Sequence, residues 1–141
     1  MSWAEPGWSA GDCRMHFQVQ GTTLRVELAG ATGTAQARLA CWTRVSEQVQ
    51  CSGAGAVLAV DRREGALAAP GEWRALLKDL DLAAFKNLPL AYVGSWPRVA
   101  QMEALNLSLL ERGFRAQVFD DEAAAARWLR YGEHGRALRP G

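Results

Sequence analysis

Charged and polar residues that could bind or transform a ligand follow three apolar segments of the chain. Each segment has the length and composition of a buried strand, and parallel strands meet at one sheet edge with their carboxyl ends, where open α/β sheets bind ligands. The three clusters are Asp61-Arg62-Arg63-Glu64, Gly94-Ser95-Trp96 and Asp120-Asp121. We therefore expect a binding site at this edge, with the candidate residues Asp61, Arg62, Arg63, Ser95 and Trp96.

Each candidate has a specific chemistry and a structural alternative. Arg62 and Arg63 could clamp a phosphate or carboxylate, because guanidinium groups match the geometry of those anions. Ser95 precedes an expected helix, so it could favour an anion or simply cap the helix. Trp96 could contact a partner, since tryptophan is enriched at interface hot spots. Loops and helix caps use the same residue types, so a structural role stays open for every one of them.

Catalytic and cofactor motifs are harder to assemble from this sequence. His16 lies in an expected strand and His134 near the end of the chain, and neither has a predictable Ser or Cys partner for a triad. The segment Gly30–Ala35 (GATGTA) lacks the P-loop lysine and the spacing of a dinucleotide fingerprint. The two histidines are far apart, and the cysteines have no zinc-ligand spacing. We expect no catalytic residue, no cofactor and no metal.

A phospho-accepting receiver domain is an alternative suggested by Asp61, Asp120 and Asp121. A receiver needs an acidic pair after its first strand and a lysine after its fifth. Here the first expected strand runs into Gly21-Thr22, and no lysine follows Lys86. Fold class alone cannot supply the missing residues, so this alternative is not favoured.

Composition is that of one ordinary globular domain. The 141 residues are 49% hydrophobic and 22% charged, and the formal net charge is +1. This charge favours neither nucleic acid nor an anionic membrane as a partner. No run of about 20 apolar residues would span a membrane. The first 14 residues lack a signal-peptide pattern, and unpaired cysteines suit a reducing compartment, so a cytoplasmic location is expected.

The order of expected elements indicates an α/β domain. Residues 15–20 and 24–28 alternate apolar and polar side chains around Gly21-Thr22, which predicts an antiparallel hairpin. A helical period follows from Thr34 to Ser52-Gly53. The apolar runs 54–60, 88–93 and 114–119 predict parallel strands, with helices over 70–84, 97–112 and 121–131.

We thus expect a mixed sheet of about five strands with four helices, in a single domain spanning residues 15–131. The stretch before it, 1–14, is expected to be an irregular arm, and 132–141 a flexible tail. The outer strand of the hairpin would offer an unpaired edge through which two copies could form a homodimer.

Three stretches resemble the small bacterial SpoIIAA-like proteins, which share the STAS fold and are grouped with STAS/SEC14-type domains. They are the hairpin from Met15 to Leu28, the strand AYVG (91–94), and GFRAQVFDDEAAAARWL (113–129). The resemblance implies a four-turn β/α superhelix and a non-catalytic module that binds a regulatory protein partner or a small ligand. A carrier or enzyme for an anionic or lipid-like ligand, using the carboxyl-end edge, is the alternative.

The chain departs from the family at its regulatory serine. The antagonist branch of the family controls a partner kinase through a serine that follows the central strand in an Asp-Ser-Ser/Thr-Gly context. This chain has Asp61-Arg62-Arg63-Glu64-Gly65-Ala66 there. The departure argues against phosphoregulation of that type.

Overall fold

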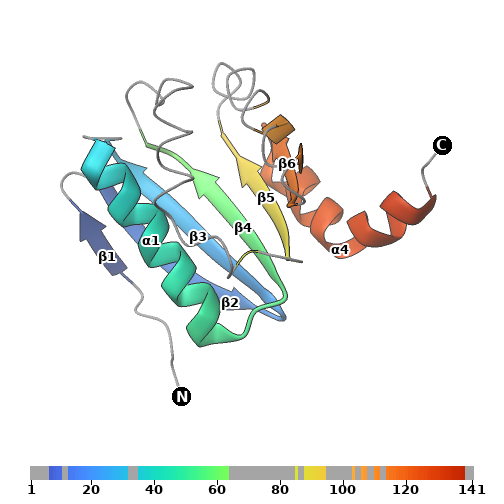
Figure 1. Cartoon of the computed structure of the whole chain (residues 1–141), viewed down its shortest axis with the longest axis horizontal. Coiled ribbons are helices and arrows are strands. Elements are labelled where there is room, and N and C mark those ends of the chain that lie inside the picture. Colours follow the sequence, from blue (N-terminus) through green and yellow to red (C-terminus); the bar gives the residue numbers. More distant parts are fainter. Residues whose placement is uncertain are drawn as a thin grey trace.

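A mixed six-stranded sheet forms the centre of the molecule (Figure 1). The computed structural model describes residues 7–10, 13–31, 35–63, 85, 88–94, 103, 106–107, 110–111 and 114–138. Within these residues the strands lie in the order in which they occur in the chain. They are β1 (Gly7–Ala10), β2 (Cys13–Gln20), β3 (Thr23–Gly30), β4 (Ala56–Asp61), β5 (Pro89–Val93) and β6 (Arg115–Phe119). The prediction of an α/β domain with a mixed sheet is confirmed.

The hairpin forms as predicted, with β2 antiparallel to β3. Gly21 turns the chain between them with φ of 64°, a left-handed conformation that suits glycine. Cys13, Met15 and Phe17 on β2 are buried, whereas the intervening side chains are exposed. One face of the hairpin therefore contacts the core and the other faces water.

Strand β1 corrects the expectation of an irregular arm over residues 1–14. Gly7–Ala10 pairs antiparallel with β2, with Trp8 opposite Met15, and β2 itself begins at Cys13. A short edge strand is held by its backbone ladder, so it needs no alternation of side chains that a sequence could reveal.

Strands β4 and β5 are parallel neighbours in the interior of the sheet, as predicted. All six residues of β4 are buried, and the strand pairs in parallel with β3 on one side and β5 on the other. Strand β5 in turn pairs in parallel with β6. The run without alternation, AVLAV, is explained by this position, because both faces of the strand are covered.

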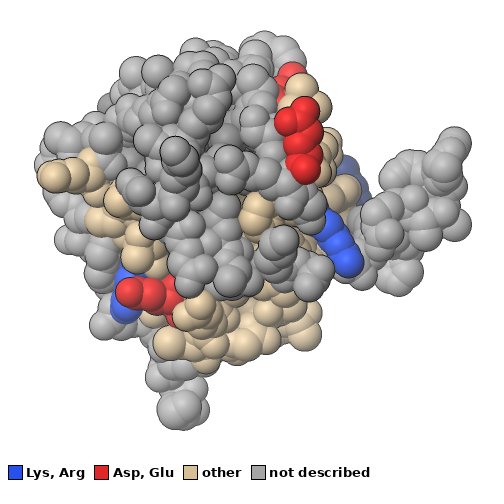
Figure 2. All heavy atoms as spheres, in the orientation of Figure 1, with Lys and Arg blue, Asp and Glu red and all other residues tan. Residues whose placement is uncertain are grey.

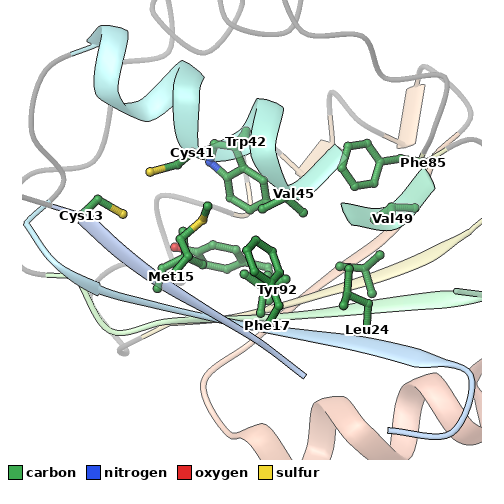
Figure 3. Packing of buried hydrophobic residues seen from close by; sticks show 14 of the residues in the cluster. Cys13, Met15, Phe17, Leu24, Cys41, Trp42, Val45, Val49, Phe85 and Tyr92 are labelled. Atoms are coloured by element: carbon green, nitrogen blue, oxygen red, sulfur yellow. The ribbon is translucent and has the colours of Figure 1, made fainter. Parts of the chain in front are cut away.

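Two described helices cover the two faces of the sheet. Helix α1 (Ala35–Ser52) packs Trp42, Val45 and Val49 onto one face, where Figure 3 shows them against residues of β2, β3 and β5. Helix α4 (Glu122–Leu138) packs Ala125, Trp128 and Leu129 onto the other face, over β4 and β5. Both sets of inward-facing residues agree with the helical periods in the sequence. No described helix is long and apolar enough to cross a membrane.

The helix ends also follow from local chemistry. Gly53, with φ of 68°, ends α1, and its N–H donates to the carbonyl of Val49 at 3.2 Å. The Asp121 carboxylate accepts a hydrogen bond from the N–H of Ala124 at 3.0 Å and so caps α4. Helix α4 continues to Leu138, beyond residue 132, where a tail was expected to begin.

Two further helices were expected. The one at 70–84 lies outside the described residues. In the one at 97–112, the described residues 103, 106, 107, 110 and 111 are helical. Leu107 and Leu110 in this segment are 62% and 46% exposed. The described residues thus contain α1, α4 and part of the helix expected at 97–112.

Candidate functional site

The C-terminal end of β4 carries the charged residues that the sequence singles out. Val57, Ala59 and Asp61 alternate onto the face of the sheet that α1 covers, while Leu58 and Val60 face α4. Asp61 is the last residue of β4 and lies opposite Leu28 of β3. The strand pleat therefore directs this carboxylate into the core rather than toward the sheet edge.

Asp61 is bound by Arg63 and Tyr92. Arg63 donates to Oδ1 from its backbone N–H at 3.0 Å and from Nε at 2.8 Å, and to Oδ2 from Nη2 at 2.8 Å. The hydroxyl of Tyr92, on the neighbouring strand β5, donates to Oδ2 as well. The guanidinium and the carboxylate thus form a bidentate salt bridge with charge-assisted hydrogen bonds.

Both charged groups of the Asp61–Arg63 pair are buried, so each depends on the other for its charge. The side chains of Arg63 and Asp61 are 2% and 0% exposed. Burial alone raises the pKa of the Asp61 carboxyl, but the hydrogen bonds and charge of Arg63, with the Tyr92 hydroxyl, bring that pKa below its ordinary value. Burial likewise opposes the charge on Arg63, yet Asp61 raises the pKa of the guanidinium. Both groups therefore stay charged, each neutralised by the other.

Two cysteines complete this buried cluster. Cys13, from β2, and Cys41, from α1, are both fully buried, and each thiol lies within hydrogen-bonding range of the other. Arg63 and Asp61 act on both thiols through their charges. We call Asp61, Arg63, Tyr92, Cys13 and Cys41 the buried cluster.

Arg62 lies on the opposite face of the sheet from Arg63. Its Nε is 2.9 Å from Glu27 of β3, and its Nη2 is 3.8 Å from Glu122 at the start of α4. Arg25 of β3 binds the same two acids, Glu122 through Nε at 2.7 Å and Nη2 at 3.1 Å, and Glu27 through Nη1 at 3.1 Å. Two arginines and two glutamates thus form a neutral network that ties α4 to β3.

This network is more solvated than the buried cluster. The Arg25 side chain is 12% exposed, but that of Arg62 is 57% exposed. The hydrogen bond from Arg25 lowers the pKa of Glu122, with the charge of Arg62 as a smaller contribution, and Glu122 raises the pKa of Arg25. Ion pairs that are partly exposed to solvent contribute little to stability individually. The main effect of the network is therefore to orient the first turn of α4.

The structure separates residues that the sequence grouped. Asp61 and Arg63 come together, but Arg62 and Arg63 contact opposite faces, so the two arginines do not form one anion clamp. Asp121 caps α4 and Asp120 is exposed. Ser95 and Trp96 lie outside the described residues.

The strand order also removes one reason for expecting a ligand at this edge. Crevices in open α/β sheets form where the strand order reverses. Here each strand lies beside its predecessor from β1 to β6, so the described sheet contains no such reversal.

The dimer prediction needs a similar correction. The hairpin strand expected to be unpaired, β2, has β1 on its outer side and β3 on its inner side. The edges of the described sheet are β1 and β6. Pairing of two copies through β2 is therefore excluded in this arrangement.

Three members of the buried cluster were not predicted. Tyr92 could have been, because in adjacent parallel strands it falls on the same face as Asp61 by simple alternation. Cys13 falls within the expected irregular arm, and no local sequence pattern places Cys41 beside it. The third cysteine, Cys51, is exposed on the same helix as Cys41.

The chain matches no protein-family model, no curated protein and no solved structure. On the face seen in Figure 2, the described charged side chains lie in small scattered groups, one of which contains both an acidic and a basic side chain. Assignment of a function must therefore rely on the geometry of the two charged clusters and on the surfaces around them.

Proposed function

We propose that this domain is a non-catalytic, STAS-like binding module that acts through a partner protein. The observation that carries the proposal is the closed pairing of Asp61 with Arg63 and Tyr92. A carboxylate that acts as a base or nucleophile must reach its substrate. The Asp61 side chain is 0% exposed and already accepts hydrogen bonds on both oxygens, so its role is to hold the end of β4.

The strand order supports the STAS-like part of the proposal. In a β/α superhelix each connection advances by one strand in the same direction, and the parallel strands β3 to β6 lie in that sequential order. Helix α1 provides one such connection, between β3 and β4. Arg63, in the stretch where the family's antagonist branch has its regulatory serine, is committed to Asp61, so the module would act without that phosphorylation.

The outward face of β2 supports an interaction through a surface. Arg14, His16, Gln18 and Gln20 alternate along this strand and are all exposed. Helix α4 packs on β4, β5 and β6, so it covers the other half of this sheet face. An exposed polar sheet face beside a helix is a surface that a partner protein can cover without entering a cavity.

Affinity capture with surface variants tests this function. The reduced wild-type chain would be immobilised and exposed to native lysate, and retained proteins and small molecules would be identified by mass spectrometry. The test variant is His16→Glu with Gln18→Glu, on the outward face of β2. The matched control is Thr43→Glu with Gln50→Glu, on the exposed side of α1.

We expect a protein that is retained by the wild type and the α1 variant and lost with the β2 variant. A protein retained equally by all three would contradict the assignment of this face. Retention of a small molecule that the chain converts to a product would contradict the non-catalytic function itself.

A further inference from the structure

Two buried thiols meet between the first core strand and the first helix. Cys13 opens β2 and Cys41 lies in the middle of α1, and both are 0% exposed. Figure 3 shows Cys41 on α1 and Cys13 at the end of β2 below it, at one end of the core cluster. The two thiols lie within hydrogen-bonding range of each other, although 27 residues lie between them in the chain.

The surroundings of this pair are charged rather than purely apolar. Arg63, 2% exposed at its side chain, lies close enough to Cys13 for its charge to act on the thiol. Its Nη1 has no hydrogen-bond partner among the described residues, whereas Nε and Nη2 are occupied by Asp61. A buried cationic N–H without a partner next to a thiol favours negative charge on that sulfur.

The ionisation of the two thiols follows from the same contacts. The hydrogen bond from Cys41 lowers the pKa of Cys13 to about 7, with help from Arg63, against burial and the charge of Asp61. The same hydrogen bond, together with burial, raises the pKa of Cys41. The pair thus consists of one sulfur suited to attack and one that keeps its proton.

We propose that Cys13 and Cys41 are a site of reversible thiol oxidation, at which hydrogen peroxide creates a disulfide bond between β2 and α1. The proposal is independent of the binding function above. It rests on the proximity of two buried thiols at one end of the core and on the buried Arg63 beside them.

The reaction proceeds in two balanced steps. The Cys13 thiolate attacks one oxygen of the peroxide, the O–O bond breaks, and the products are a sulfenic acid on Cys13 and hydroxide. The Cys41 sulfur then attacks the sulfenic sulfur, the S–O bond breaks, and its hydroxyl leaves as water with the Cys41 proton. Two electrons pass from the sulfurs to the peroxide, and an added dithiol reverses the bridge by exchange.

The test uses Cys51 as an internal reference. Cys51 lies on α1 as well but is exposed, so in the wild type it reports that the oxidant reaches and oxidises an ordinary thiol. The measured protein is Cys51→Ser, which leaves only the buried pair. The folded, fully reduced protein would be treated with hydrogen peroxide, quenched, unfolded in the presence of an alkylating reagent, and analysed by intact mass and non-reducing peptide mapping.

We expect loss of both alkylation sites, a mass lower by two hydrogen atoms, and a peptide linking Cys13 to Cys41 that disappears after reduction. Thermal unfolding of the bridged protein should shift to higher temperature and return on reduction. With Cys41→Ser added, Cys13 should be trapped by dimedone as a sulfenic acid; with Cys13→Ser added instead, Cys41 should not be.

The proposal is overturned if both buried thiols remain alkylatable at a peroxide dose that fully oxidises Cys51 in the wild type. It is also overturned if the products are only bridges between molecules. The primary measurement needs only the Cys51→Ser protein, so poor folding of the other two variants would not weaken it.

Discussion

Removing the Arg63 guanidinium should be among the most destabilising single changes in the described part of the domain. In Arg63→Met the side chain keeps similar bulk, but the donors at 2.8 Å from Nε and Nη2 to the Asp61 carboxylate are lost. The carboxylate, 0% exposed, then keeps only the backbone N–H and Tyr92 among these donors. Breaking one partner of a buried ion pair costs about 3–5 kcal/mol.

An independent count of hydrogen bonds gives a similar figure. Each hydrogen bond to a charged group contributes about 1.5–3 kcal/mol, and two are lost, so the expected loss is about 3–6 kcal/mol. For a domain of this length, 1 kcal/mol corresponds to a shift of about 3–4 °C in Tm. The expected decrease in Tm is therefore about 9–20 °C.

Urea unfolding followed by circular dichroism measures this effect, with Arg62→Met as the matched control. Arg62 is the next residue in the chain, but its side chain is 57% exposed, so its loss should cost less than about 1 kcal/mol. Adding Asp61→Asn to Arg63→Met removes the uncompensated charge, so the double variant should be more stable than the sum of the singles by at least about 1 kcal/mol. Equal losses for the two arginine variants, with additive singles, would refute the reasoning.

Four further predictions concern Tyr92, Glu122, the acid sensitivity of Asp61 and the glycine that ends α1. Tyr92→Phe should lower the urea-derived stability by about 1.5–3 kcal/mol, because a donor to a buried carboxylate is lost; an unchanged midpoint would contradict this. Glu122→Gln should cost less than about 1 kcal/mol, and the difference should shrink in high salt, where a constant difference would argue against a solvated pair. The pKa of Asp61 is lower in the folded state than its ordinary 3.8, so the unfolded state binds more protons between the two pKa values. The contribution of Asp61 to stability should be fully present above about pH 3.8 and lost as the pH falls through the folded-state pKa, and the loss of stability on acidification should be smaller in Asp61→Asn. Gly53→Ala should cost about 1 kcal/mol, because φ is 68° there, a backbone conformation that alanine adopts only with strain. The cost should not be larger, because no atom lies within 4 Å of the new Cβ; a neutral effect on Tm would contradict the cap.

Most of the described sheet could be predicted because burial leaves a pattern in the sequence. Strand β4 is an unbroken apolar run because both of its faces are covered. In β2, apolar and polar side chains alternate because one face of the strand is exposed to solvent. Strand β1 could not be predicted in the same way. Four residues at an edge are positioned by backbone pairing with β2, which any residue type except proline can supply.

The sequence pattern predicts that Asp61, Arg62 and Arg63 lie at the C-terminal end of β4, but not how their side chains are directed. The alternation of β4 continues one step beyond the strand, so Arg62 and Arg63 turn to opposite faces, and extending the same alternation in the sequence would have shown it. The contact between Cys13 and Cys41 is different. It depends on which face α1 covers and on where its middle turn lies along β2, and both are set by tertiary packing rather than by local pattern.

The acid titration of Asp61 tests the central claim, that this carboxylate is closed off by Arg63 and Tyr92, most directly. Carbon-13 NMR of the aspartate carboxyl groups, with Asp61→Asn to assign the resonance, follows its ionisation in the folded chain. Our account predicts a pKa below 3.8, with no titration of this resonance at higher pH. A resonance that titrates at or above that value while the chain stays folded would contradict it.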